Sequence, residues 1–114
     1  MFTILEILIL FGITVIINMH IGICKFTIHI PGSQSLKNKR RVITSLMGRI
    51  QKRFNVSVSE VDHQDNWQLS TIGITCHNTD RRQLNSILDS ILGFVREYEG
   101  EYILTDNQRE IIVG

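Results

Sequence analysis

A run of basic side chains is the feature of this sequence with the clearest chemical use. Seven of the twelve lysines and arginines lie within residues 37–53, which contain no acidic residue, while ten of the eleven acidic residues lie at or after Glu60. The seven are Lys37, Lys39, Arg40, Arg41, Arg49, Lys52 and Arg53. Cations gathered in this way suit the phosphate groups of a nucleic acid. The alternative is a solvated helix whose charges pair with the acidic second half of the chain.

A second polar cluster lies within residues 60–67. It contains Glu60, Asp62, His63, Asp65 and Trp67. Carboxylates and an imidazole this close together can hold a metal ion or perform acid–base chemistry. Strand alternation puts Asp62 and His63 on opposite faces, however, and Asp residues in turns usually satisfy backbone groups. We therefore predict no catalytic residue and no metal site here, and we treat Asp62, His63, Asp65 and Trp67 as candidates for a partner-binding surface.

Motifs typical of enzymes are missing from the sequence. It has no nucleophile elbow, Walker loop, dinucleotide-binding glycine motif or zinc-ligand spacing, so we predict a non-enzymatic protein without a cofactor. Cys24 and Cys76 both lie in apolar, strand-like runs. This pattern favours two reduced thiols packed as small hydrophobic side chains, in a cytoplasmic protein. The alternative, a disulfide between neighbouring strands, requires an oxidising compartment.

The elements that must position these residues follow from the hydrophobic pattern. Alternating apolar and polar residues predict strands, and apolar residues spaced three, four and seven apart predict helices. In chain order we predict a strand over 20–30, a helix over 36–54, strands over 55–62 and 67–77, a helix from Asp80 to Gly100, and a last strand over 101–113. Right-handed crossovers and a central hairpin then favour one fold class, α+β. It is a ferredoxin-like β-α-β-β-α-β sandwich, with a four-stranded antiparallel sheet and two helices on one face.

Local signals place the ends and irregularities of these elements. Ser35 is a good N-cap for the first helix, and Asp80 for the second, with Gln83 as a capping-box partner. Val61 is out of phase with its strand, which predicts a bulge or a strand end there. Residues 106–107 predict a bulge or break in the last strand.

The uncovered face of the predicted sheet is polar. It carries Lys25, Thr27, His29, Thr71 and Thr75 and offers no Phe or Tyr on which RNA bases could stack. If RNA binds, we therefore expect the basic helix to make the contact, through shape and phosphates. The open face or an edge strand is the alternative, as the interface of a homodimer or a protein adaptor. His29 and His77 share this face and are predicted neighbours.

The first eighteen residues do not match the rest of the chain. Their longest uncharged stretch, from Ile7 to Met19, is shorter than the roughly 20 apolar residues that a membrane helix needs. A well-patterned strand begins directly after Met19. We predict that Met19 is the natural start and that 1–18 come from an upstream start codon. One alternative is that 1–18 form a membrane-associating helix, which would be the protein's one route to a membrane contact. The other is that they form an extra element capping the domain. The domain itself spans 19–114.

Two long runs, HIPGSQSLKNKRRVITSL (29–46) and RFNVSVSEVDHQDNWQ (53–68), resemble the YlxP-like family of small bacterial proteins, whose function is unknown. The resemblance covers residues 19 to about 113 and departs from the family at Asn38, where members usually have an acid, and in the 18-residue extension. It implies a ferredoxin-like fold. Family genes tend to lie beside translation and ribosome-maturation genes, which implies, by association, a partner that is RNA or a ribosomal particle. We expect no DNA specificity. The resemblance carries no catalytic residue to this chain.

Overall fold

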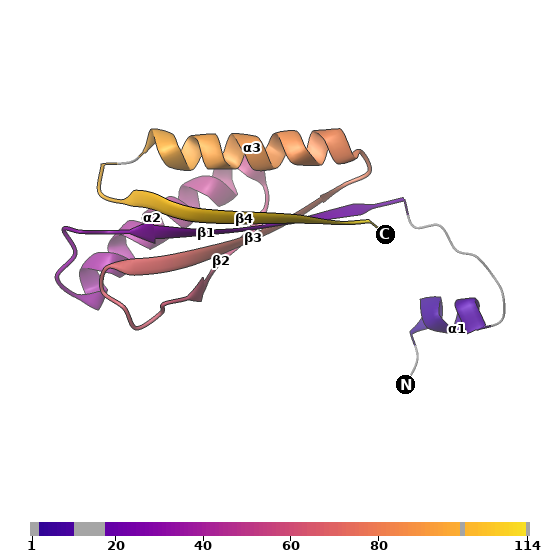
Figure 1. The fold of residues 1–114 in the computed structure, drawn as a ribbon, viewed down its shortest axis with the longest axis horizontal. Helices are drawn as coiled ribbons and strands as arrows, with labels where there is room; N and C mark the ends of the chain where they lie inside the picture. The colour runs from indigo at the N-terminus through magenta and orange to yellow at the C-terminus, as the bar shows by residue number, and fades with distance from the viewer. Residues whose placement is uncertain (1–2, 11–17, 99, 114) are drawn as a thin grey trace.

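The computed structural model describes residues 3–10, 18–98 and 100–113. Within these ranges the chain forms four strands and three helices (Figure 1). They are α1 (Ile4–Leu10), β1 (His20–His29), α2 (Leu36–Phe54), β2 (Ser57–Asp62), β3 (Leu69–Asn78), α3 (Arg81–Glu97) and β4 (Ile103–Val113). From β1 onward the order is the predicted β-α-β-β-α-β.

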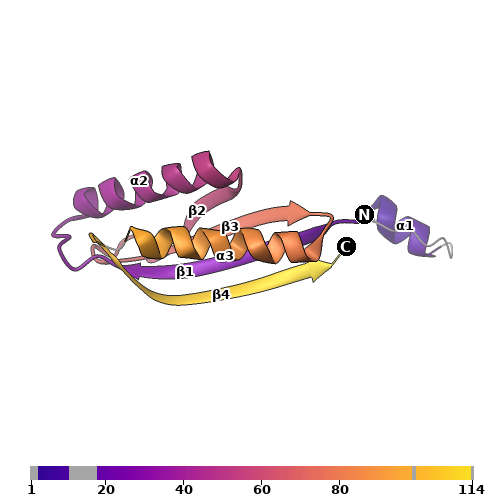
Figure 2. The same ribbon diagram turned by 90° about the horizontal axis from the view of Figure 1, so that it is seen from above.

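The strands form one antiparallel sheet in the order β2-β3-β1-β4. At one end of central strand β1, His20 pairs with Val113 of β4, and at the other end His29 lies between Leu69 of β3 and Ile103 of β4. Figure 2 shows α2 and α3 side by side, with both helices running roughly along the strands. The predicted ferredoxin-like α+β fold is therefore confirmed.

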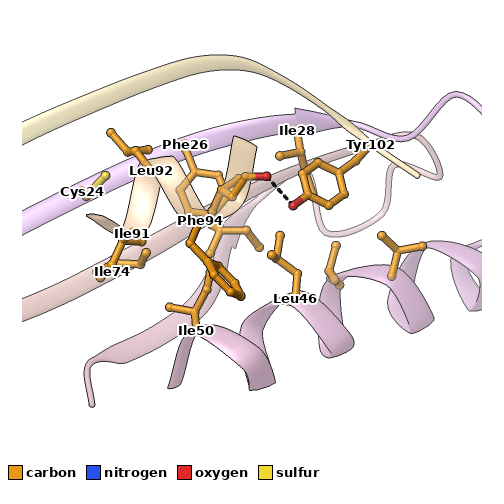
Figure 3. Close-up of a cluster of buried hydrophobic side chains, with 14 of the residues drawn as sticks. Cys24, Phe26, Ile28, Leu46, Ile50, Ile74, Ile91, Leu92, Phe94 and Tyr102 are labelled. Atoms are coloured by element: carbon orange, nitrogen blue, oxygen red, sulfur yellow. Dashed lines mark hydrogen bonds between the residues drawn. The ribbon is translucent and has the colours of Figure 1, made fainter. Parts of the chain in front are cut away.

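The core lies between the two helices and the covered face of the sheet (Figure 3). Cys24, Phe26 and Ile28 alternate inward along β1 and belong to the same buried cluster as Leu46 and Ile50 of α2. Burying a large apolar side chain contributes about 1.5–3 kcal/mol before chain entropy is subtracted. The helices are therefore stabilised mainly by packing of their apolar faces, because isolated helices of this length are marginal in water.

The connection from α3 to β4 is tied to the core by a tyrosine. The buried Tyr102 hydroxyl donates a 2.7 Å hydrogen bond to the Val95 carbonyl (Figure 3). Tyr98 follows the last residue of α3, is 45% exposed and contacts the ring of Phe94 at 4.7 Å between centroids. The helix ends at Glu97 with Tyr98 as its C-cap, before the Gly100 that was predicted to stop it.

Side chains cap both long helices. Ser35 Oγ accepts a 3.1 Å hydrogen bond from the Asn38 backbone N–H at the start of α2, as predicted. Asn55 ends this helix in the left-handed region at φ 50°, which Asn tolerates better than most residues. At α3, Asp80 Oδ1 accepts from the backbone N–H groups of the first turn, and the Asp80 N–H donates to Asn78 Oδ1 at 2.8 Å. Asn78 therefore fills the place that we predicted for Gln83.

Bulges occur in both edge strands. The β2–β3 register shifts between Glu60 and Asp62, so the bulge predicted at Val61 is confirmed. Gly73 is the position beside which Val61 packs: an added Cβ there would lie 2.7 Å from Val61 Cγ1. In β4 the irregularity predicted at 106–107 is a bulge that lies one residue earlier. The strand is continuous at 106–107, and the shift falls where Thr105 is skipped in the pairing with β1.

The N-terminal helix α1 lies apart from both layers of the domain (Figures 1 and 2). It begins with a reciprocal capping box, in which the Thr3 N–H donates to Glu6 Oε2 and the Glu6 N–H donates to Thr3 Oγ1. In the described residues, no helix is both long enough and apolar enough to cross a bilayer. Residues 1–2 and 11–17 lie outside the described residues, and the start at Met19 stays a prediction.

Candidate nucleic-acid interface

Lys39 does not belong to the exposed basic set. Its side chain is 0% exposed, so the structure corrects the prediction that it faces an anionic partner. The ammonium points from the first turn of α2 toward the covered face of β2 and β3. Its Nζ lies 2.9 Å from Glu60 Oε2, and Ser70 Oγ donates to the same carboxylate oxygen at 2.6 Å. A buried charge is tolerated only with such partners.

The same ammonium holds the loop between β2 and β3. Lys39 Nζ donates to the carbonyl of His63, and to that of Gln64 at 3.4 Å. His63 itself has a positive φ of 61°, an uncommon backbone state for a residue with a side chain. Lys39 therefore satisfies carbonyls of a loop that turns sharply and fixes this loop against α2.

Helical spacing contains the signal that identifies Lys39 as an interior residue. Counting from Lys39, the buried residues Ile43, Leu46 and Ile50 follow at four, seven and eleven positions. These offsets place all four side chains on one stripe of a helix. A lysine in register with the apolar stripe, and a glutamate that falls on the inward side of a nearby strand, together indicate a buried pair.

The six remaining basic residues of α2 are exposed. Two of them lie over aromatic rings on the side toward α3: Arg49 Cζ is 5.2 Å from the Tyr98 ring centroid, and Arg53 Cζ is 5.1 Å from that of Phe94. Such contacts leave the charge in water while they orient the guanidinium. Arg49 and Arg53 therefore form an ordered flank of the basic helix.

The outer face of α2 carries the other four cations. Arg41 lies 3.8 Å from Glu101, but both side chains are largely exposed, so this pair contributes little and Arg41 remains available to a ligand. Within the described residues, Lys37, Arg40 and Lys52 form no salt bridge. A shallow, open depression of about 820 Å³ follows the first turns of the helix. It is lined by Lys37, Asn38, Arg40, Arg41, Thr44 and Ser45.

Side-chain and backbone hydrogen bonds organise the β2–β3 loop. The Asp62 carboxylate accepts from the His63 N–H at 2.7 Å, and Asn66 Oδ1 accepts from the backbone N–H groups of Gln68 and Leu69. In the described part of the chain, no three His, Cys, Asp or Glu side chains come together as a metal site. Asp65 is exposed, and so is Trp67, whose side chain is 55% accessible.

Gln68 joins this loop to the segment that leads into α2. Its side-chain amide donates to the carbonyls of Pro31 and Ser33, and its own carbonyl accepts a 2.7 Å bond from the Ile30 N–H. The structure thus brings together two features that the sequence presents separately. The start of the basic helix and the partner-surface candidates Asp62, His63, Asp65 and Trp67 meet at one end of the molecule.

The uncovered sheet face is more apolar than predicted. Besides the polar residues named from the sequence, it carries Ile21 and Ile23 of β1, Val61 of β2, Leu69 of β3, and Ile103 and Ile112 of β4. Thr27 and Thr71 share a 2.9 Å hydrogen bond across the strands. His29 pairs with Leu69 and His77 with Ile21, at opposite ends of the sheet, so the predicted contact between these histidines is wrong.

Both thiols are free and lie in neighbouring strands. Cys24 in β1 is fully buried, and Cys76 in β3 is partly buried. Cys24 lies opposite Ile74, and Cys76 lies opposite Gly22, so the two thiols are offset diagonally. Burial raises the pKa of each thiol above its ordinary value. The two thiols are therefore protonated and packed in an apolar layer. This agrees with the prediction that they pack as small hydrophobic side chains.

Comparison with known proteins places the domain in a family. The family model described as "Protein of unknown function (DUF503)" matches residues 21–109, which include α2 and the β2–β3 loop. The chain belongs to the DUF503 family. The uncharacterized protein YlxP of Bacillus subtilis (strain 168) is 37% identical to it over 75 residues, which cover 66% of this chain and 79% of YlxP. The YlxP-like resemblance is thus confirmed, and it assigns the DUF503 domain no activity.

Two solved structures resemble the DUF503 chain more distantly. The de novo designed protein Foldit4 has a TM-score of 0.47 at 12% identity, and the likeness covers 82% of this chain and 98% of Foldit4. An amidase of the hydantoinase/carbamoylase family from Burkholderia phymatum also has a TM-score of 0.47, at 11% identity. That likeness covers 85% of this chain and 29% of the amidase. Similarity at this level carries no argument about function.

Proposed function

We propose that this protein is a non-enzymatic, cytoplasmic RNA-binding protein that contacts RNA, free or within a ribosomal particle, through the outer face of α2. The observation that carries this proposal is a helix with six exposed cations and no acidic residue. They are Lys37, Arg40, Arg41, Arg49, Lys52 and Arg53. Lys39 contributes indirectly, because it holds the first turn of the helix against the β2–β3 loop.

The length of α2 and the spacing of its cations suit a chain of phosphates. A helix of 19 residues is about 28 Å long, so cations on its first and last turns reach phosphates several nucleotides apart. Lys37, Arg41 and Lys52 fall within about 60° of one another around the helix axis. Each phosphate contact releases condensed counterions, and three contacts give an affinity that falls with salt at a logarithmic slope of about −2 to −3.

Charge reversal tests the proposal. The triple variant K37E/R41E/K52E should lose RNA binding in a filter or fluorescence-anisotropy assay, and the wild type should show the salt slope given above. The matched control R81E/R82E/R96E reverses three exposed arginines of α3 and changes the net charge equally. Equal loss in both triples would show that only net charge matters. Undiminished binding by the α2 triple would remove the proposal.

A sucrose-gradient profile of cell lysate tests the ribosomal form of the proposal. Wild-type protein should sediment with ribosomal subunits at low salt, and the α2 triple should stay at the top of the gradient. Wild-type protein that remains at the top at every salt concentration would limit the partner to free RNA.

The open sheet face supports a second candidate, a homo-oligomer or protein adaptor. Val61, Ile103 and Ile112 are each 45–51% exposed on or beside this face. Ile112 lies beside Ile21 at one end of the face and Ile103 lies at the other end, so apolar side chains occur along the length of the face. A partner that covers the whole face would bury them all. Light scattering should then give a dimer mass that an I103E/I112E variant reduces to that of a monomer. A wild-type monomer at high concentration would argue against this candidate.

A further inference from the structure

Trp67 is an exposed aromatic ring on an ordered loop. Its side chain is 55% accessible. This exposure is notable because an indole can bury more apolar surface in a core than most side chains can. The residues on both sides of it are fixed, because Asn66 Oδ1 bonds to the Gln68 N–H and the Gln68 amide bonds to the Ser33 carbonyl. The indole is therefore presented to solvent by a backbone that is held in place.

The same loop is attached to the basic helix. Lys39 Nζ binds the carbonyls of His63 and Gln64, and Lys39 lies in the first turn of α2 between two exposed residues, Asn38 and Arg40. The indole and the cations of the first turns thus lie at one end of the molecule, on two segments that Lys39 joins. A ligand that contacts both must offer an aromatic or apolar group beside negative charge.

Single-stranded RNA has this chemistry, because each unpaired base carries a flat face next to a phosphate. We infer that the RNA is single-stranded where it meets the β2–β3 loop, with one base stacked on Trp67 and the adjoining phosphates on Lys37, Arg40 and Arg41. This inference rests on the proposed function and specifies its substrate. In a duplex the faces of the bases are covered by their neighbours, so only unpaired bases can stack on a protein ring.

The charges around the indole fit a base better than a phosphate. Asp62, the last residue of β2, and Asp65 of the loop are exposed and repel a phosphate placed there. Carboxylates can, however, accept hydrogen bonds from the amino groups of bases. The uncovered sheet face offers isoleucines, threonines and histidines for stacking but no Phe, Tyr or Trp among its paired positions. Trp67 therefore provides the stacking surface that the sheet lacks.

Intrinsic fluorescence gives a direct test, because Trp67 is the one tryptophan of the chain. A single-stranded oligoribonucleotide of about 12 nucleotides without self-complementarity should quench the emission saturably. A blunt RNA duplex of the same length should quench it little. By fluorescence anisotropy with labelled RNA, W67A should bind the single strand about 5- to 150-fold more weakly than wild type, which is the usual effect of removing one stacking ring. W67F keeps a ring face and should recover most of the affinity.

The variants separate this inference from the proposed function. Unchanged single-strand affinity in W67A, together with lost binding in K37E/R41E/K52E, would overturn the stacked base and keep the basic-helix proposal. Equal quenching by duplex and single strand would also overturn it. No binding of either RNA by wild type would remove both. If W67A left RNA affinity unchanged but dissociated a dimer in light scattering, the indole would belong to a protein interface instead. Thermal melts of W67A and W67F establish that each variant is folded.

Discussion

Lys39→Met is the substitution that tests the central contact of the structure. It removes the ammonium but keeps an unbranched side chain in the apolar stripe. The Glu60 carboxylate, 16% exposed, is then left with the Ser70 hydroxyl as its hydrogen-bond donor. The Gln64 carbonyl loses the Lys39 ammonium, and the His63 carbonyl keeps only the Asn66 backbone N–H, at 3.0 Å. Removing one partner of a buried ion pair typically destabilises a protein by about 3–5 kcal/mol. We expect K39M to lower the free energy of unfolding by about this amount.

Urea denaturation followed by far-UV circular dichroism measures the effect. With an m-value of about 1–3 kcal/mol/M, the midpoint for K39M should fall by at least about 1 M. The matched control is K37M, the same substitution two residues earlier on the exposed side of the same helix, where a change within about 0.5 kcal/mol is expected. Equal midpoints for K39M and K37M would refute the burial of Lys39 and its hold on the loop.

A double variant separates charge pairing from packing. K39M/E60L removes both charges, so the uncompensated carboxylate that destabilises K39M is absent. The double variant should therefore be more stable than K39M, although the His63 and Gln64 carbonyls still lack the Lys39 ammonium. A double variant no more stable than K39M would assign the loss to the missing contacts between Lys39 and the loop and to packing, and the ion pair would contribute nothing measurable.

Three further predictions concern the sheet and the core. G73A should destabilise the domain by about 1–3 kcal/mol in urea titrations, because the new methyl meets Val61 Cγ1 at 2.7 Å. Adding V61A should restore most of this loss, and no restoration would contradict the contact. Y102F should cost about 0.5–1.5 kcal/mol, since the Val95 carbonyl loses a buried hydrogen bond; an unchanged midpoint would count against that bond. Burial raises the pKa of the Cys24 thiol above its ordinary value of 9.0, so the folded state keeps a proton that the unfolded chain releases, and stability should fall as pH rises above about 9. The urea midpoint should drop less between pH 8 and pH 10 in C24A than in wild type; an equal drop would mean that other groups cause it.

Local patterns were sufficient to predict the order and type of the elements. The stripe of α2, its Ser35 N-cap and the phase slip at Val61 each depend on a few neighbouring residues, and each occurs in the structure as predicted. The irregularity in β4 was placed one residue too late because Asp106 and Asn107 are typical turn residues. Pairing with β1 keeps them in a continuous strand, and the register shifts at Thr105 instead. Tertiary pairing thus overrides local preference in an edge strand.

The candidate site could be predicted only in pieces. The basic run and the polar loop were each visible, but their meeting depends on a bond between Lys39 and carbonyls 24 and 25 residues away. Charge count alone treats every lysine of a helix as exposed, and this error hid the contact. The same lack of register information led to the wrong pairing of His29 with His77. Distances along a sheet depend on the register of its strands, which a single sequence does not specify.

The pairing of His20 with Val113 brings the beginning of β1 next to the end of β4, at the pole opposite Trp67. An affinity tag or fluorescent protein fused before β1 or after β4 is therefore attached at the same end of the sheet. It lies far from the Trp67 indole and the first turns of α2. The same adjacency makes circular permutation practicable, since a short linker can join these two strand ends while new termini are opened elsewhere in the domain.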